Sequence, residues 1–196
     1  MSRLALALLT TALAACAGTP KAAPPGPRGV MTGLDVLEAE GFKSLRGKRV
    51  ALITNRTGVD RRGRAITDLF ASAPGLELVA VFTPEHGFTA SSESENISSS
   101  TLRVGGRSIP IHSLYGGGID GMRPRDEQLF GVDALVFDIQ DIGARFYTYT
   151  TTLAYAMEEA AKRAIPFVVL DRPNPITGAV VEGEPLSPLI RHFTAH

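Results

Sequence analysis

The residues best suited to chemistry are concentrated in one stretch, 138–149, which directly follows the apolar run 134–137. Its polar members are Asp138, Gln140, Asp141, Arg145, Tyr147 and Tyr149. Carboxylates can serve as general acids, bases or nucleophiles, and arginine binds anions through paired hydrogen bonds. A helix cap would explain Asp141 or Thr148, but not the whole group. The stretch therefore predicts a binding or catalytic site.

Smaller polar groups follow three other apolar runs. They are Asn55 after 49–54, Glu85 and His86 after 76–83, and Asp171, Arg172 and Asn174 after 166–170. Asn55 and Asn174 could equally be turn residues, because asparagine readily forms Asx turns. His86 could be structural or catalytic, and its place beside Glu85 after a strand favours a functional role. No second histidine lies at metal-ligand spacing, so no metal site is predicted.

The segments that must position these groups alternate between strand-like and helix-like patterns. Strands are expected at 49–54, 76–83, 134–138 and 166–170, and a hairpin at 102–111 should turn at Gly105-Gly106. Helices are expected near 34–42, 67–71 and 149–163, and after Pro124. The short helix after Pro124 should bury Leu129 and Phe130. The longest should bury Leu153, Met157 and Ala160 or Ala161.

This alternation predicts an α/β fold, a Rossmann-like, mostly parallel sheet with helices on both faces. Open sheets of this kind bind ligands beyond the carboxyl ends of their strands. We therefore expect the four polar groups to converge on one crevice. The candidate catalytic residues are Glu85, His86, Asp138 and Asp141, and the candidate substrate-binding residues are Asn55, Gln140, Arg145, Tyr147, Tyr149, Asp171, Arg172 and Asn174.

Composition excludes several functional classes. The 196 residues are 44% hydrophobic, which suits one compact domain, and 20 basic residues balance 20 acidic ones. A nucleic-acid-binding protein would need a basic stripe, so no nucleic-acid partner is expected. Neither a G-x-G-x-x-G turn nor a P-loop follows a predicted strand, so no nucleotide cofactor is expected.

The amino-terminal residues predict export and a lipid anchor. Residues 1–16 combine Arg3, an apolar run too short to cross a bilayer, and small residues before Cys16, the only cysteine. The ending LAAC resembles a bacterial lipobox, which implies lipidation of Cys16; an ordinary signal peptide with a chance cysteine is the alternative. Residues 17–32 should form a Pro/Gly/Ala-rich tether. The expected location is the cell envelope, on the periplasmic face of the outer membrane if the cell has one.

Six motifs in order resemble one protein family. They are LRGKRV (45–50), TNRTG (54–58), PEHG (84–87), SLYG (113–116), FDIQDIGARFYTY (137–149) and LDRPNP (170–175). The chain resembles the DUF1343 family, which includes exo-β-N-acetylmuramidases of the NamZ type, from about residue 33 to 185.

The resemblance implies a Rossmann-like domain at 33–185 and a smaller carboxyl-terminal domain, with the active site between them. The implied reaction removes terminal N-acetylmuramic acid from peptidoglycan fragments or muropeptides, without a cofactor. Glu85 of the PEHG motif would be the general acid. Its partner could be Asp138, Asp141 or Asp171, or the N-acetyl group of the substrate. Arg145 or Arg172 would suit the lactyl carboxylate.

Two departures from the family qualify this expectation. The segment after Gly87 reads FTASSE, followed by a serine-rich run, instead of the family's glycine-containing turn. The tail 186–196 does not resemble the family's continuation, and we expect a truncated member that lacks the second domain and could be inactive. The alternative function is a lipid-anchored muropeptide- or sugar-binding protein without catalysis, which would not need an acid at Glu85.

Overall fold

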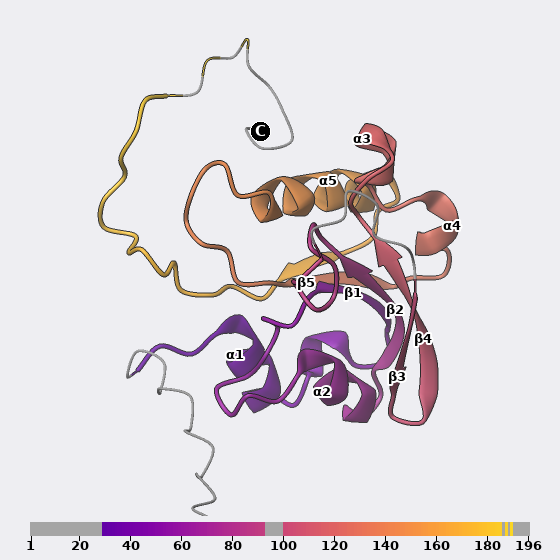
Figure 1. The fold of residues 1–196 in the computed structure, drawn as a ribbon. Coiled ribbons are helices and arrows are strands. Elements are labelled where there is room, and N and C mark those ends of the chain that lie inside the picture. Colours follow the sequence, from indigo (N-terminus) through magenta and orange to yellow (C-terminus); the bar gives the residue numbers. More distant parts are fainter. Residues whose placement is uncertain (1–28, 93–99, 186, 188, 190–196) are drawn as a thin grey trace, which may run out of the picture.

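The computed structural model describes residues 29–92, 100–185, 187 and 189. Its centre is a six-stranded sheet in the order β3-β4-β2-β1-β5-β6 (Figure 1). The strands are β1 (Arg49–Thr54), β2 (Glu77–Thr83), β3 (Ser100–Val104), β4 (Arg107–Ser113), β5 (Ala134–Asp138) and β6 (Phe167–Val169). All neighbours pair in parallel except β3 and β4, the hairpin predicted around Gly105-Gly106.

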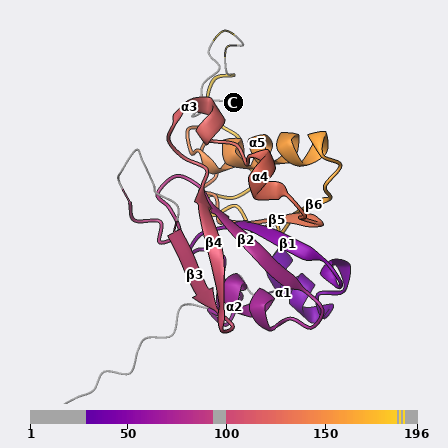
Figure 2. The ribbon, with the colours of Figure 1, turned by 90° about the vertical axis from the view of Figure 1, so that its right-hand side faces the viewer.

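Helices cover both faces of this sheet, as Figures 1 and 2 show. α1 (Gly33–Ala39), the 3-10 turn η1 (Lys43–Leu45) and α2 (Ile66–Ser72) lie on one face, and α3 (Gly118–Gly121), α4 (Asp126–Leu129) and α5 (Tyr149–Lys162) on the other. Successive strand side chains alternate between the two faces. In β1, Leu52 joins the core beneath α1 and α2, while Ile53 joins the core beneath α5. The predicted α/β fold is confirmed.

Three predicted helix positions are wrong. Phe130 is 87% exposed, because α4 is a single turn that ends at Leu129 and the backbone is extended at Phe130. Met157 is 46% exposed, because α5 packs through positions 149, 152, 156 and 160. Of the two alternatives for the last buried position of this helix, Ala160 is buried and Ala161 is exposed. Phe42 is buried but lies beyond α1, at a left-handed backbone position with φ of 56°.

The start of α1 packs directly on the end of β6. The Gly33 N–H donates to the carbonyl oxygen of Asp171 at 2.7 Å. A Cβ atom at Gly33 would lie 2.6 Å from the Asp171 nitrogen and from the Leu170 Cα. Only glycine permits this approach, which joins the start of α1 to the residues that follow β6.

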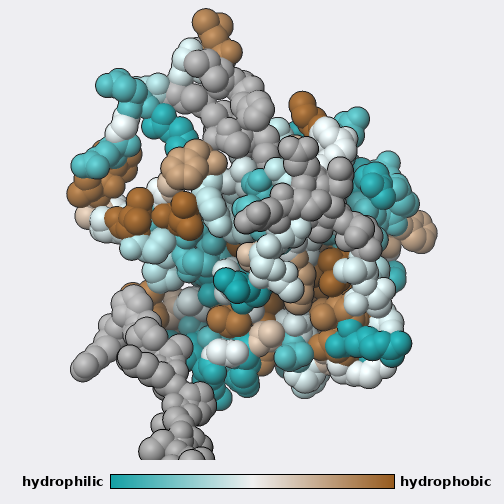
Figure 3. All heavy atoms as spheres, in the orientation of Figure 1, coloured by the Kyte–Doolittle hydropathy of each residue, from teal (hydrophilic) through white to brown (hydrophobic). Residues whose placement is uncertain are grey.

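Several apolar side chains of the segments that follow β5 and β6 are exposed. They include Phe146, Ile176, Val180 and Val181, with exposed fractions between 61% and 95%. Figure 3 shows hydrophobic side chains gathered on the left of the molecule, where these segments run in Figure 1. Among the helices of the described ranges, none is both long and apolar enough to cross a bilayer. The predicted signal segment with Cys16, and residues 17–28 of the tether, lie outside those ranges.

Candidate active site

Four strand ends bring the predicted polar groups to one edge of the sheet. Thr54 of β1 is in register with Asp138 of β5, and Phe137 of β5 with Val169 of β6. β2 pairs with the other side of β1. The residues that follow these strands therefore emerge side by side, at the place where open α/β sheets bind ligands.

Glu85 lies in the turn that follows β2 and is half-buried. Its Oε2 atom accepts a hydrogen bond of 2.6 Å from the hydroxyl of Thr148, at the start of α5. No described residue donates to its Oε1 atom. In the described part of the chain, one carboxyl oxygen is thus fixed by Thr148 and the other has no partner.

His86 shapes the loop that follows Glu85. Its backbone has φ of 69°, and Gly87 continues with φ of 71°. Non-glycine residues seldom adopt this conformation, and such positions are frequent at functional sites. The His86 Nδ1 atom lies 2.9 Å from the carbonyl oxygen of Ser92. A carbonyl only accepts, so Nδ1 carries the hydrogen and Nε2 is the ring nitrogen left for another partner.

Asn55 makes hydrogen bonds inside the site to Tyr149 and Thr57. The Asn55 Nδ2 atom donates to the Tyr149 hydroxyl at 3.1 Å, and its Oδ1 atom accepts from the nitrogen and hydroxyl of Thr57 at 2.9 and 2.6 Å. Asn55 and Tyr149 are each 2% exposed. Burial, together with Tyr147, raises the pKa of the Tyr149 hydroxyl well above its ordinary value, so the phenol stays protonated. These contacts disfavour the predicted role of both residues in touching substrate.

Gln140 makes hydrogen bonds to the segments that follow three strands, β1, β5 and β6. Its backbone N–H donates to the Thr57 hydroxyl at 3.0 Å, which links β5 to the turn after β1. Its side-chain Nε2 atom donates to the carbonyl oxygens of Asp141 at 2.8 Å and Pro173 at 3.0 Å. The second of these bonds reaches the segment after β6. Gln140 therefore acts mainly as a brace between segments.

Asp138 and Arg172 form a buried ion pair. The Arg172 Nε and Nη2 atoms donate to the two carboxylate oxygens of Asp138 at 2.6 and 2.9 Å, and Nη2 also donates to the Val59 carbonyl at 2.9 Å. The side chains are 0% and 8% exposed. Burial raises the pKa of Asp138, and the guanidinium opposes that shift. The pair disfavours Asp138 as the second catalytic carboxylate and Arg172 as a ligand for a substrate anion.

Gly58 allows the turn after β1 to lie against β5. A Cβ atom there would clash with the Thr54 hydroxyl and lie 3.1 Å from the Asp138 carbonyl oxygen. The Thr54 hydroxyl already donates to that carbonyl at 2.8 Å. The final glycine of the TNRTG motif is therefore required by close packing.

The other two predicted acids lie nearer the surface. Asp141 and Asp171 both line a cavity of about 170 Å³ between the start of α5 and the end of β6. Asp141 accepts from the Gly143 N–H at 2.7 Å through Oδ1, while its buried Oδ2 atom has no partner among the described residues. Asp171 is exposed and accepts from the backbone N–H of Arg172 at 2.9 Å.

The remaining predicted residues differ in how far they are engaged. Arg145 is exposed and donates to the carbonyl oxygen of Glu184 at 2.5 Å. Tyr147 is half-buried, with its ring 4.6 Å from that of Tyr149. Asn174 accepts from the Ile176 N–H at 3.0 Å and is exposed, which is the Asx turn weighed as its alternative.

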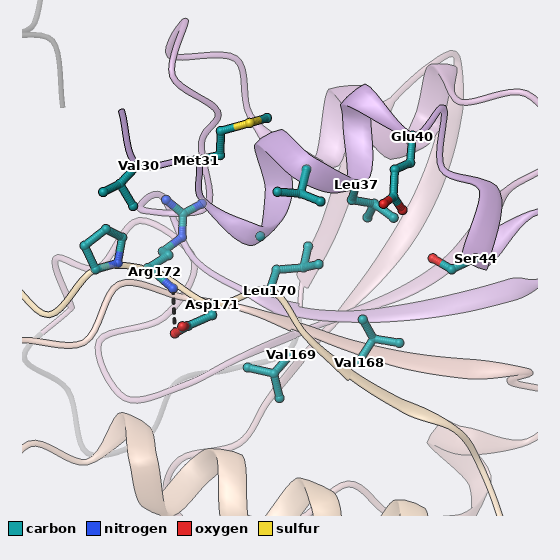
Figure 4. A pocket seen from close by; sticks show the side chains of 13 residues that line it. Val30, Met31, Leu37, Glu40, Ser44, Val168, Val169, Leu170, Asp171 and Arg172 are labelled. Carbon is teal, nitrogen blue, oxygen red and sulfur yellow. Dashed lines mark hydrogen bonds between the residues drawn. The ribbon is translucent and has the colours of Figure 1, made fainter. Parts of the chain in front are cut away.

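Another hollow of the described surface does not include Glu85 in its lining. It is a groove of about 480 Å³ along the edge strand β6, between that strand and α1 (Figure 4). Its walls are mostly apolar and include Leu37, Val168 and Leu170, with Asp171 and Arg172 at one end.

Within the described ranges, no three potential metal-binding side chains lie together.

Two threonines that bind predicted site residues were not predicted from the sequence. Thr148 was considered only as a helix cap, but it makes no capping hydrogen bond and binds Glu85 instead. Thr57 connects Asn55 to Gln140. Both lie within the recognised motifs, but a threonine at the start of a helix or in a turn has the same local signature whatever its hydroxyl binds.

Comparison with known proteins gives consistent results. Residues 50–196 match the family described as exo-β-N-acetylmuramidase NamZ, N-terminal. The chain is 43% identical over 166 residues to the peptidoglycan β-N-acetylmuramidase NamZ of Bacillus subtilis (strain 168), an alignment covering 84% of this chain and 39% of that protein. The chain thus spans about two fifths of the length of this curated relative.

Two solved structures of DUF1343 family proteins from Bacteroides fragilis NCTC 9343 are also similar. The first is 42% identical with a TM-score of 0.73, covering 84% of this chain and 40% of that one. The second is 30% identical with a TM-score of 0.57, covering 74% and 35%. The resemblance carried by the six motifs is confirmed, and the chain belongs to the DUF1343 family, to the part described as the N-terminal region of exo-β-N-acetylmuramidase NamZ.

Proposed function

We propose that this chain supplies the general acid of a glycoside hydrolase that removes terminal N-acetylmuramic acid from peptidoglycan fragments, and that the acid is Glu85. The observation that carries the proposal is the state of the Glu85 carboxyl group. It lies at the strand-end edge of the sheet, with Oε2 bound by Thr148 and Oε1 without a described partner. The similarity to a peptidoglycan β-N-acetylmuramidase supplies the substrate class.

The chemistry required of Glu85 is a single proton transfer. As the bond between the sugar's anomeric carbon and the glycosidic oxygen breaks, that oxygen takes the proton and departs as an alcohol. The positive charge that develops on the sugar ring must then be met by a second carboxylate or by the acetamido oxygen of the substrate. Asp141 and Asp171 are the candidates for the carboxylate, because Asp138 is occupied by Arg172.

The contacts also favour one arginine for the acidic lactyl group of the substrate. Arg172 has its guanidinium engaged with Asp138 and the Val59 carbonyl. Arg145 is exposed, and among the described residues its guanidinium donates only to a backbone carbonyl, that of Glu184. A guanidinium binds a carboxylate more strongly than a neutral carbonyl, so a substrate anion would displace that contact. We assign the lactyl carboxylate to Arg145.

The test is Glu85→Gln in this chain joined to the smaller carboxyl-terminal domain that the family resemblance implies, with a chromogenic N-acetylmuramic acid glycoside as substrate. Loss of a general acid should lower kcat by about 10²- to 10⁴-fold. The free energy of unfolding should change by less than about 0.5 kcal/mol, because Glu85 is not part of the core. Glu182→Gln, at an exposed position, is the matched control and should leave turnover unchanged.

Two results would contradict the proposal. If Glu85→Gln retains most of the turnover, Glu85 is not the acid. If the unmodified protein binds muropeptides in equilibrium dialysis but releases no sugar, the alternative of binding without catalysis is favoured over hydrolysis.

A further inference from the structure

We infer that Thr148 is the positioning residue for Glu85, holding one carboxyl oxygen so that the other is presented to the glycosidic oxygen. The catalytic part of this inference rests on the proposed function, whereas the contact itself does not. Thr148 lies 63 residues after Glu85 in the sequence, and its hydroxyl is 2.6 Å from Glu85 Oε2. Thr148 would act through Glu85 without touching the substrate.

The backbone of Thr148 explains why its hydroxyl is free for this role. A threonine before a helix usually has an extended backbone, and its oxygen accepts from an N–H of the first turn. Thr148 instead has φ of −80° and ψ of −9°, and makes no capping hydrogen bond. It is 5% exposed, and a buried hydroxyl needs a partner. Glu85 is the partner it has.

Thr148 is itself held by its neighbours on both sides. Tyr147 and Tyr149 pack edge to face with ring centres 4.6 Å apart. Tyr149 is anchored through its hydroxyl to Asn55, at the end of β1. The hydroxyl that reaches Glu85 is therefore fixed relative to the sheet. A carboxyl group after β2 is oriented by a helix that follows β5.

This arrangement assigns different tasks to the two carboxyl oxygens. Oε2 accepts a short hydrogen bond of 2.6 Å from a buried donor, which restricts rotation of the carboxyl group. Oε1 is then the oxygen that carries the transferable proton. Small errors in the placement of a reacting group are costly, and a displacement near 1 Å can reduce a rate by about 100-fold.

The test compares three variants of the same two-domain protein that is used to test Glu85. Thr148→Val removes the hydroxyl and keeps the shape, Thr148→Ser keeps the hydroxyl, and Thr152→Val is the matched control. Thr152 is also buried on α5, one turn along, but its hydroxyl lies 3.3 Å from the Thr148 carbonyl and does not contact Glu85. A purely structural role would make the two valine variants alike.

We expect Thr148→Val to lower kcat by about 10- to 100-fold with KM within about twofold of the parent. Thr148→Ser should restore most of the rate, and Thr152→Val should retain it. A loss of kcat in Thr152→Val equal to that in Thr148→Val, or no recovery in Thr148→Ser, would overturn the inference.

A measurement independent of turnover separates this inference from the proposed function. The side-chain carboxyl ¹³C resonance of Glu85 can be assigned by its disappearance in Glu85→Gln. At fixed pH it should move in Thr148→Val and stay in place in Thr152→Val. A resonance unmoved by Thr148→Val overturns the inference even if the enzyme is active. If the resonance moves but the parent protein releases no sugar, the positioning contact stands and the proposed hydrolysis fails.

Discussion

The carboxyl ends of β2 and β5 carry similar residues but use them in opposite ways. At the end of β5, the carboxylate of Asp138 is buried, and Arg172 binds both of its oxygens. After β2, Glu85 is half-buried, and the described residues hold it through one oxygen only. At the end of β5, both carboxylate oxygens are engaged in the ion pair with Arg172. After β2, the Oε1 atom of Glu85 has no partner among the described residues. An acid at a strand end is therefore a candidate for chemistry only if the fold leaves one of its oxygens unengaged.

The difference arises from where each acid lies relative to its strand. Asp138 is the last residue of β5, which is buried along its whole length, so its side chain cannot reach water. A buried carboxylate needs a cation and further hydrogen bonds. Glu85 lies two positions beyond Thr83, the end of β2, in a turn that begins with Pro84. The turn carries it out of the sheet, and a neutral hydroxyl is enough to hold it.

The largest expected effect comes from breaking the ion pair between Asp138 and Arg172. Asp138→Ala leaves the guanidinium of Arg172 buried without its partner, and should lower the free energy of unfolding by about 3–5 kcal/mol. Urea denaturation followed by circular dichroism would measure it. Replacing both residues, as Asp138→Leu with Arg172→Met, should recover much of this loss. A single variant as stable as the parent would show that the pair does not support the strand ends.

The next largest effect tests how closely the turn after β1 packs against the end of β5. Gly58→Ala places a methyl group against the Thr54 hydroxyl and the Asp138 carbonyl, and overpacking of this kind costs about 1–3 kcal/mol. Differential scanning calorimetry should show a lower Tm. The matched control is Gly178→Ala, where an added Cβ meets nothing within 4 Å. Equal shifts in the two variants would contradict the close approach of the turn to β5.

The smallest effect is a dependence of stability on acid pH. Asp60 braces the turn after β1: its Oδ1 accepts from the N–H groups of Arg62 and Arg64 at 2.9 and 2.7 Å, and its Oδ2 from Arg64 Nε at 2.7 Å. Burial opposes ionisation, but these bonds prevail and lower the pKa of Asp60 below its usual 3.8.

A lowered pKa gives stability that is present above the unfolded value and lost as the pH falls through the folded value. We expect the free energy of unfolding to fall below about pH 4, and to fall less in Asp60→Asn than in the parent. Unfolding free energies at pH 7 and pH 3 would measure it. Asp120→Asn, at an exposed position, should keep the loss seen in the parent. If Asp60→Asn responds to acid as the parent does, the carboxylate is not what braces the turn.

Much of the fold and the location of the site could be predicted from the sequence alone. The apolar runs at 49–54 and 134–138 coincide with β1 and β5, and the glycine pair at 105–106 forms the expected turn with positive φ at both residues. These features depend on local patterns, namely hydrophobic runs and residues that tolerate unusual backbone angles. The convergence of polar groups followed from the parallel order of the strands, which fixes where their ends lie.

The assignment of roles was decided only by the tertiary structure. Arg172 pairs with Asp138 across 34 residues, and Thr148 binds Glu85 across 63. The single-turn α4 likewise left Phe130 exposed, against the sequence prediction. A sequence pattern records which side chains can form hydrogen bonds, but not which atoms meet after the strands align. Those contacts are set by the register and packing of distant segments. They determine whether a given carboxyl group is engaged in an ion pair or remains free to react.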